Sequence, residues 1–283
     1  FEVKDEDALK HAIYTALGVG YRLFDTAQCY KNEHIIGKHM WPLCAEYGIA
    51  RDEIFLISKV HPANHGYEET EQSIIKSLAD LSIDYPDLLL IHWPGTKGVP
   101  VNNVELNRTK RLETWRAMAD AYRSGRVGAI GVSNYNMSHL EELWTWIGAY
   151  DSIDPVFPVV NQVEVHPGWY PSDVIRWCQQ RGVVVQGYSR IGRARTLLKD
   201  PCIASIADEL GVSRAAVCLM YSRYFNIPII PKSINADHIL ENWRTMSGSF
   251  HPEDPGVFSE MHVTRIRENV PQCKVCWDPS VVL

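Results

Sequence analysis

Short apolar segments alternate with segments of helical periodicity along most of the chain, and this alternation limits the folds open to it. The apolar segments are rich in Val, Ile, Leu and Tyr and are almost continuously apolar, as strands buried on both faces are. They cover residues 21–25, 54–60, 87–93, 129–134, 159–165, 183–189 and 227–233. Most follow one another at roughly 30 residues, the length of a crossover between parallel strands. The pattern predicts an α/β protein with a parallel sheet.

Helices are expected between these strands. Residues 5–18 open on acidic side chains and close at Gly18, and residues 112–125 close at Gly125. Ser213 is placed to cap a helix over 213–225, and Pro171 to begin one over 171–182. The other expected helices cover 67–81, 137–147 and 235–246.

Two observations favour a closed barrel over a doubly wound sheet. No G-x-G-x-x-G follows any of the strands, so the dinucleotide fingerprint of the doubly wound fold is missing. Polar residues also stand at the C-terminal ends of the strands: Asp25, Lys59, His92, Ser133, Asn134, Gln162, Tyr188, Lys232 and Ser233. In a (β/α)8 TIM barrel these ends meet on one face, where the loops build the active site. We therefore predict a (β/α)8 barrel.

The predicted barrel is one strand short. The chain opens on Phe1 and a helix follows almost at once, so we expect the first strand to lie upstream of the sequence shown, because an open seam would expose strand edges. No linker or repeat divides the chain. We expect one domain over 1–283, with 251–283 as a C-terminal extension that has few regular elements and packs over a barrel end.

Charge and cysteine usage point to a small-molecule partner. A net charge of -6 and a pI near 6.0 give no general attraction to nucleic acid or to an anionic membrane, and no apolar run approaches the roughly 20 residues of a membrane span. We expect a cytoplasmic monomer. The 7 cysteines are scattered, as reduced thiols are. The pair Cys273 and Cys276 has the C-x-x-C spacing of a metal or redox site, but no second pair completes a zinc ligand set.

Four ionisable side chains in these regions suit one kind of reaction when taken together. Asp25, Tyr30, Lys59 and His92 supply a carboxylate, a phenol, an ammonium and an imidazole. A phenol is a poor acid because its ordinary pKa is about 10, and an adjacent ammonium lowers that pKa. Such a set can give a proton to a carbonyl oxygen while another group supplies a hydride. Taken singly, each has a structural explanation: a cap, a packed ring, a solvated lysine or a turn.

At these residues the chain resembles the aldo-keto reductase family. The resemblance rests on GYRLFDTAQCYKNE, the SK of LISKV, LLLIHWP, IGVSNY, NQVEVHP, GYS and IPKS, in this order. It implies a (β/α)8 barrel, NAD(P)H bound without a Rossmann domain, no metal, and reduction of aldehydes or ketones to alcohols. By residue-wise match, Asp25, Tyr30, Lys59 and His92 fall on the catalytic tetrad of the family. His92 also favours carbonyl reduction, since a Glu there accompanies double-bond reduction.

The resemblance also assigns cofactor contacts. It places Ser133, Asn134 and Gln162 around the nicotinamide carboxamide, Tyr188 against the ring and Ser189 near the pyrophosphate. At the adenosine end it places Lys232, Ser233, His238, Glu241 and Asn242. A lysine and a hydroxyl suit a 2′-phosphate, so NADPH is expected, with NADP+ as its product. NADH stays possible, because His238 stands where NADP-preferring members generally carry Arg. The other interpretation is that these polar residues satisfy one another.

Several features leave alternatives open. His61 stands where relatives often have Trp, and Arg190, Arg193 and Arg195 lie in a loop that either approaches the cofactor phosphates or is simply solvated. Trp93, Trp169 and Trp277 are candidate walls for flat or apolar aldehydes, or core residues. The sequence does not choose among sugars, lipid aldehydes, steroids and ketones. Two other classes remain: a nicotinamide-binding regulatory subunit with little turnover, and a Schiff-base aldolase with Lys59 as nucleophile.

Overall fold

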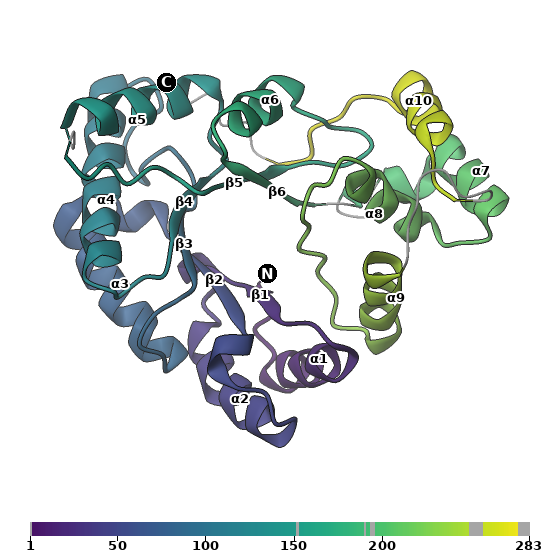
Figure 1. Ribbon diagram of the computed structural model, residues 1–283, viewed down its shortest axis with the longest axis horizontal. Helices are drawn as coiled ribbons and strands as arrows, with labels where there is room; N and C mark the ends of the chain where they lie inside the picture. The colour runs from purple at the N-terminus through teal and green to yellow at the C-terminus, as the bar shows by residue number, and fades with distance from the viewer. Residues whose placement is uncertain (1, 151–152, 190, 193–195, 249–256, 277–283) are drawn as a thin grey trace. The chain divides into compact units, whose positions relative to one another are not determined.

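The computed structural model describes residues 2–150, 153–189, 191–192, 196–248 and 257–276 (Figure 1). The chain divides into two compact units. The first unit comprises 1–161, 176–184 and 279–283, and the second comprises 162–175 and 185–278. Both are built from parallel strands and helices, so the predicted α/β class is confirmed.

Four parallel strands form the sheet of the first unit. They are β1 (Leu23–Asp25), β2 (Phe55–Val60), β3 (Leu88–Ile91) and β4 (Ile130–Ser133), and they pair in chain order. The register joins Asp25 to Ile57, Lys59 to Leu90 and Leu90 to Gly131. β5 (Val160–Glu164) begins in this unit, where the Val159 amide donates to the Ile130 carbonyl at 3.0 Å. Parallel pairing in chain order is what the crossover spacing predicted.

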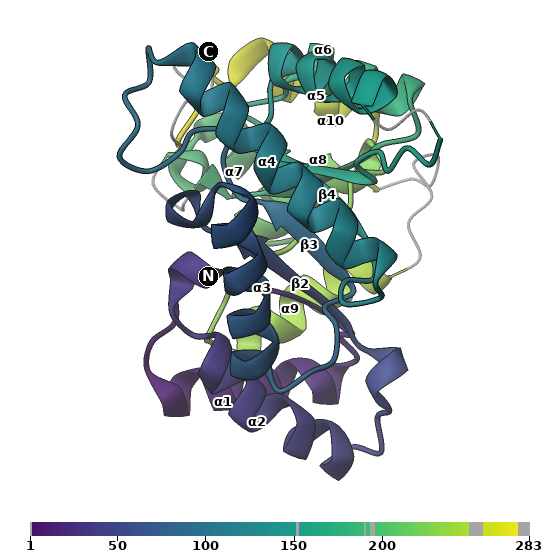
Figure 2. The same cartoon turned by 90° about the vertical axis from the view of Figure 1, so that its left-hand side faces the viewer.

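Helices join these strands. They are α1 (Glu6–Val19), α2 (Glu33–Glu46), α3 (Tyr67–Leu81), α4 (Val104–Arg123) and α5 (Met137–Tyr150), with one-turn helices η1 (Gln28–Tyr30), η2 (Arg51–Glu53) and η3 (Pro62–Asn64). Figure 2 shows α3 and α4 lying over β2, β3 and β4. α1 was predicted to end at Gly18. It ends at Val19 instead, and Gly20, with a φ of 112°, is its left-handed C-cap. α4 ends at Arg123, two residues before the predicted Gly125. α2 was not predicted, because it starts in a polar stretch and contains Pro42.

The two faces of the first sheet have different surroundings. Leu56 belongs to a buried cluster with Leu17 of α1 and Met40 of α2, so its side of β2 faces the helices. Ile57 belongs to a second cluster, with Leu88 and Leu90 of β3. Because side chains alternate along a strand, Lys59 lies on the same face as Ile57, away from α1 and α2.

The second unit holds the rest of β5, most of β6 (Val184–Tyr188) and the later helices. These are the start of α6 (Ser172–Gln180), η5 (Leu197–Lys199), α7 (Pro201–Leu210), α8 (Arg214–Tyr224), α9 (Ala236–Ser247) and α10 (Glu260–Asn269). Ser213 caps α8 as predicted, because its hydroxyl accepts from the Ala216 amide at 3.0 Å. α7 was not among the predicted helices.

The predicted seventh strand, residues 227–233, is not a strand in the structure. It makes one isolated parallel bridge, between Gly187 and Ile229, in which the Gly187 amide donates to the Pro228 carbonyl at 2.9 Å. Pro228 and Pro231 have no amide hydrogen, so the segment lacks the donors of a regular ladder. The prediction of a strand here was wrong, and of this apolar run only Ile227 is buried.

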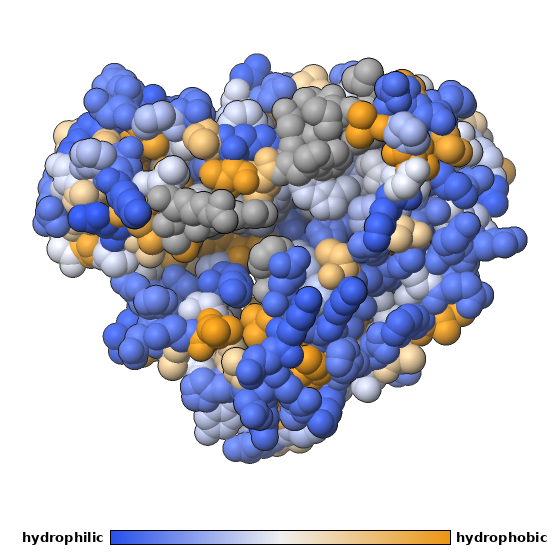
Figure 3. Space-filling model, turned by 180° about the vertical axis from the view of Figure 1, so that it is seen from behind, coloured by the Kyte–Doolittle hydropathy of each residue, from blue (hydrophilic) through white to orange (hydrophobic). Residues whose placement is uncertain are grey.

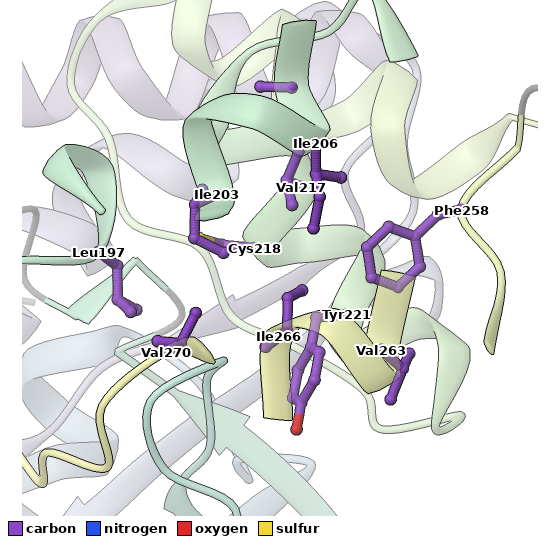
Figure 4. Packing of buried hydrophobic residues seen from close by; sticks show 11 residues of the cluster. Leu197, Ile203, Ile206, Val217, Cys218, Tyr221, Phe258, Val263, Ile266 and Val270 are labelled. Carbon is purple, nitrogen blue, oxygen red and sulfur yellow. The ribbon is translucent and has the colours of Figure 1, made fainter. Parts of the chain in front are cut away.

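The extension from 251 is more regular than predicted, because it contains α10. Figure 4 shows Phe258, Val263 and Ile266 meeting side chains of α7 and α8 in one apolar cluster. The fully buried members include Ile203 and Val217. α10 therefore completes the core beside α7 and α8. The single domain over 1–283 and the packing of the extension over a barrel end stay predictions.

One face of the molecule is mainly polar. On the face of Figure 3, hydrophilic residues predominate and hydrophobic ones form separate patches. No helix within the described ranges combines the length and the apolar character needed to cross a membrane.

Candidate active site

The ends of β1 to β4 bring polar side chains to one face of the first sheet. Asp25 pairs with Ile57, and Lys59 follows two residues later on the same face. Lys59 pairs with Leu90, two residues before His92. By the same alternation Ser133, two residues after Gly131, belongs to this face. The register of the strands therefore places Asp25, Lys59, His92 and Ser133 on one face of the sheet.

Lys59 is fully buried and held by two oxygen atoms. Its Nζ donates to Oδ1 of Asp25 at 2.5 Å and to the Thr26 carbonyl at 2.8 Å. A buried ammonium requires such partners, because the loss of hydration is otherwise uncompensated. The same Nζ lies 5.3 Å from the centroid of the Tyr30 ring. The structure thus brings Asp25, Lys59 and Tyr30 together.

Tyr30 is presented by the turn η1, which follows β1. The Tyr30 amide donates to the Ala27 carbonyl at 2.9 Å, and its side chain is buried. Gln28 anchors the turn on both sides. Its Nε2 donates to Ser77 Oγ of α3 at 3.1 Å, and its Oε1 accepts from the His61 amide, just after β2, at 2.9 Å. The tyrosine is therefore held by a rigid turn.

His92 stands beside Tyr30 with its ring edge-on. The two ring centroids are 5.6 Å apart and the planes are at 82°. Burial lowers the pKa of His92 well below its usual 6.5, and the nearby positive charge of Lys59 lowers it further. The imidazole is therefore neutral at physiological pH, as a hydrogen-bond donor to a carbonyl oxygen should be.

Asn134 ties the end of β4 to the end of β3. Its Nδ2 donates to the His92 carbonyl at 2.9 Å and to Ser133 Oγ at 3.0 Å. Its φ of 64° is left-handed, a conformation that Asn adopts more readily than most residues. Ser133 and Asn134 are both buried, so an amide and a hydroxyl stand together after β4.

The second unit holds the remaining predicted cofactor residues in two groups. Gln162 of β5 donates through Nε2 to Gln186 Oε1 of β6 at 2.7 Å. Tyr188, the last residue of β6, is half-buried, and Ser189 follows it with a φ of 55°. Lys232 and Ser233 directly precede α9, which carries His238, Glu241 and Asn242.

The start of α9 has a capped N-terminus with exposed basic side chains beside it. Asn235 caps the helix by accepting from the His238 amide at 3.1 Å, and Ser233 Oγ accepts from the Asn235 amide at 3.0 Å. Lys232 and His238 are exposed. A helix N-terminus next to a lysine and a hydroxyl is a favourable place for a phosphate group.

Sequence reasoning missed a buried carboxylate of α2 that bonds β2 and α3. Glu33 of α2 is buried, and its carboxylate accepts from Ser58 Oγ at 2.6 Å and from Ser77 Oγ at 3.1 Å. Burial raises the pKa of this carboxyl group above its usual 4.5, although the two hydroxyls oppose the shift. The signal was present in the sequence: the stretch 26–33 after β1 is almost entirely polar.

Glu164 anchors the C-terminal segment in the second unit. It accepts from His166 Nε2 at 2.9 Å and from the amides of Val275 and Cys276 at 2.8 and 3.0 Å. Burial raises the pKa of Glu164, but these hydrogen bonds outweigh it and leave the pKa below its usual 4.5. This role too was not foreseen.

The other candidates are scattered. Trp93 lies beside His92, with ring centroids 6.3 Å apart. The Lys274 Nζ lies 5.3 Å from the centroid of the Trp169 ring. The half-buried His61 accepts from the Ala63 amide at 3.0 Å through Nδ1. Cys273 and Cys276 form no disulfide, and no cluster of three or more metal-ligating side chains exists among the residues described. Arg190, Arg193, Arg195 and Trp277 lie outside the described residues.

Comparison with known proteins defines the class. The chain is 38% identical over 242 residues to the uncharacterized oxidoreductase YtbE of Bacillus subtilis, covering 86% of this chain and 79% of that protein. With the same coverage it is 36% identical to the glyoxal reductase of that organism. The chain is therefore an oxidoreductase by relationship. Residues 2–260 match the Aldo/keto reductase family, and the protein belongs to that family.

Solved structures agree with the fold. An aldo-keto reductase from a Medee basin deep-sea metagenome library superposes with a TM-score of 0.81, at 29% identity, over 98% of this chain and 92% of that chain. The Bombyx mori aldo-keto reductase in complex with NADP gives a TM-score of 0.80, at 27% identity, over 98% of this chain and 87% of that chain.

Proposed function

We propose that this protein reduces aldehydes or ketones to alcohols, with NADPH as the hydride donor. The observation that carries the proposal is the cluster at the ends of β1, β2 and β3, where the buried Lys59 ammonium contacts both Asp25 and the Tyr30 ring and a neutral His92 stands edge-on to that ring. The relative named glyoxal reductase and the neighbour solved with NADP support the same reaction class.

Each side chain has one task in this proposal. His92 donates a hydrogen bond to the substrate oxygen and orients the carbonyl. Tyr30 gives its hydroxyl proton to that oxygen as negative charge develops there, and is reprotonated from solvent. Lys59 stabilises the phenolate that forms, and Asp25 keeps the ammonium in place. The carbonyl carbon gains a hydride and the oxygen gains the proton, so the product is an alcohol.

We assign the predicted cofactor residues to NADPH, which supplies the hydride when bound, by the chemistry of their side chains. Ser133 and Asn134 in the first unit, and Gln162 and Tyr188 in the second, offer the hydroxyl, amides and ring that a nicotinamide requires. At the adenosine end, Lys232, Ser233 and the N-terminus of α9 offer a charge and hydrogen-bond donors to a 2′-phosphate. We assign Ser189 to the pyrophosphate, and His238, Glu241 and Asn242 to the adenosine end.

The preference for NADPH over NADH should be modest. His238 is exposed, and an imidazole lacks the planar fork of donors with which an arginine binds a phosphate. The KM for NADPH should still be lower than that for NADH, because Lys232 and Ser233 remain for the 2′-phosphate. A lower KM for NADH would overturn the assignment of NADPH.

The surroundings of Lys59 argue against a Schiff-base aldolase. An ammonium that donates to Asp25 and to the Thr26 carbonyl must lose its proton and both bonds before it can attack a carbonyl. We further infer that the parallel strands belong to a single (β/α)8 barrel domain, an inference supported by the structural relatives that cover 98% of the chain.

The test is oxidation of NADPH in the presence of a panel of aldehydes and ketones, followed by loss of the dihydropyridine absorbance. The panel should include sugars, α-oxoaldehydes, lipid aldehydes and aromatic aldehydes. The proposal expects turnover with at least one of them and the corresponding alcohol as product. Tight NADPH binding without turnover on any would support the regulatory-subunit alternative instead. Covalent trapping of Lys59 by borohydride with a carbonyl substrate would support the aldolase.

A further inference from the structure

A cysteine thiol contacts the histidine of the candidate site. Cys29 precedes Tyr30 in the turn η1, and its Sγ lies 3.3 Å from Nδ1 of His92, within hydrogen-bonding distance for sulfur. Among the described residues, this contact is the one hydrogen bond to a ring nitrogen of His92. The contact joins a thiol from the end of β1 to an imidazole from the end of β3.

Other contacts hold the His92 ring but do not decide which nitrogen carries the proton. The His92 amide donates to the Val60 carbonyl at 3.2 Å, and its carbonyl accepts from Asn134 at 2.9 Å. The ring lies edge-on to Tyr30 and nearly parallel to Trp93, at 19°. A neutral imidazole held in this way still has two tautomers, and the partner of Nδ1 selects between them.

Hydrogen-bond chemistry favours one direction for this contact. The unprotonated nitrogen of an imidazole is a good acceptor, whereas a thiol sulfur is a weak one, so S–H to N is the better pairing. We propose that the Cys29 thiol donates to Nδ1 of His92 and so keeps the ring proton on Nε2. This inference rests on the proposed function, because an Nε2–H donor matters if His92 orients a carbonyl oxygen.

Both groups stay neutral, which separates this pair from a nucleophilic cysteine and histidine. Burial raises the pKa of the Cys29 thiol to about 11, although the charge of Lys59 opposes the shift. Burial also lowers the pKa of His92, and Lys59, His61 and His65 add to that effect. A thiolate beside an imidazolium would need both shifts reversed. Cys29 is therefore a positioning residue that acts through His92.

The turn that carries Cys29 is rigid enough for this role. Tyr30 and Lys31 close η1 through their amides, which donate to Ala27 at 2.9 Å and to Gln28 at 3.3 Å. The side chain of Gln28 accepts from the His61 amide and from Asn64 Nδ2, at 2.9 and 2.8 Å. The thiol is thus fixed relative to the end of β2.

Two substitutions of Cys29 distinguish the effect of its hydrogen bond from the effect of its packing. Cys29→Val keeps about the volume of the side chain and removes the donor, whereas Cys29→Ser keeps a donor. Loss of one neutral hydrogen bond corresponds to about a three- to tenfold effect. We expect Cys29→Val to lower kcat by that factor with the KM for NADPH unchanged, and Cys29→Ser to stay within about twofold of the wild type.

The tautomer itself is read from the imidazole nitrogen shifts of cofactor-free protein, with the His92 signals identified by their loss in His92→Asn. The wild type and Cys29→Ser should show a protonated Nε2, and Cys29→Val a mixture of tautomers. A protonated Nδ1 in the wild type, or an unchanged tautomer and kcat in Cys29→Val, would overturn the inference. A wild type without any reductase turnover would refute the proposed function, while the nitrogen shifts would still decide the role of Cys29.

Discussion

The most informative stability experiment removes the buried charge of Lys59. Lys59→Met keeps much of the side-chain volume but leaves the Asp25 carboxylate without the ammonium that contacts it at 2.5 Å. The side chain of Asp25 is 10% exposed and that of Lys59 is 1% exposed, so water can replace little of the lost interaction. Breaking a buried ion pair by removing one partner costs about 3–5 kcal/mol.

The magnitude can be stated as a melting temperature. At about 2.1 cal/mol/K per residue, the 283 residues carry an unfolding entropy of about 0.6 kcal/mol/K, so the loss lowers Tm by about 5–8 °C. Asp25→Asn combined with Lys59→Met removes the uncompensated charge and should recover most of that loss. Scanning calorimetry of the wild type, both single variants and the double variant completes the cycle. If the two single losses simply add in the double variant, the argument that the pair is coupled is refuted.

Three further predictions concern other groups. Glu33→Gln should remove one pH-dependent contribution to stability: the raised pKa of Glu33 makes the folded state bind its proton more tightly than the unfolded chain, so the contribution of Glu33 to stability is lost as the pH rises above the unfolded value of about 4.3. Urea unfolding of the wild type and the variant across pH tests this, and an identical pH dependence in both would contradict it. Glu164→Gln should weaken the bonds to the amides of Val275 and Cys276, with amide hydrogen exchange there faster by about tenfold or more, and unchanged protection would contradict the anchoring role. His238→Arg should lower the KM for NADPH by about two- to fivefold and leave that for NADH unchanged, since only NADPH carries a 2′-phosphate, and equal changes for both would remove His238 from that contact.

The sequence predicted β2, β3 and β4 because these strands are almost entirely buried. Continuous apolar runs such as 54–60 and 87–93 leave few alternatives to a central parallel strand, and β2 and β3 lie within them. The same criterion failed at 227–233, where only Ile227 is buried and where Pro228 and Pro231 lack the amide donors that a regular strand needs. α10 was missed because its apolar residues are few and meet their partners on α7 and α8.

The candidate site, like the fold, could be predicted only in part. Asp25, Lys59 and His92 could be predicted to converge, since parallel strands place their C-terminal ends together. The supporting contacts could not be predicted, because they depend on how the turn η1 lies against α3 and the end of β2. The contact of Cys29 with His92, at 3.3 Å, joins residues far apart in the sequence and is visible only in three dimensions.

The central claim is that Tyr30 gives the proton to the substrate oxygen, and Tyr30→Phe tests it most directly. The variant removes the hydroxyl and keeps the buried ring that lies beside Lys59 and His92. NADPH affinity, measured by fluorescence titration, should stay within about twofold, while kcat should fall by about a hundredfold or more, the usual contribution of a general acid. A variant that binds NADPH normally and still turns over aldehydes at the wild-type rate would contradict the account.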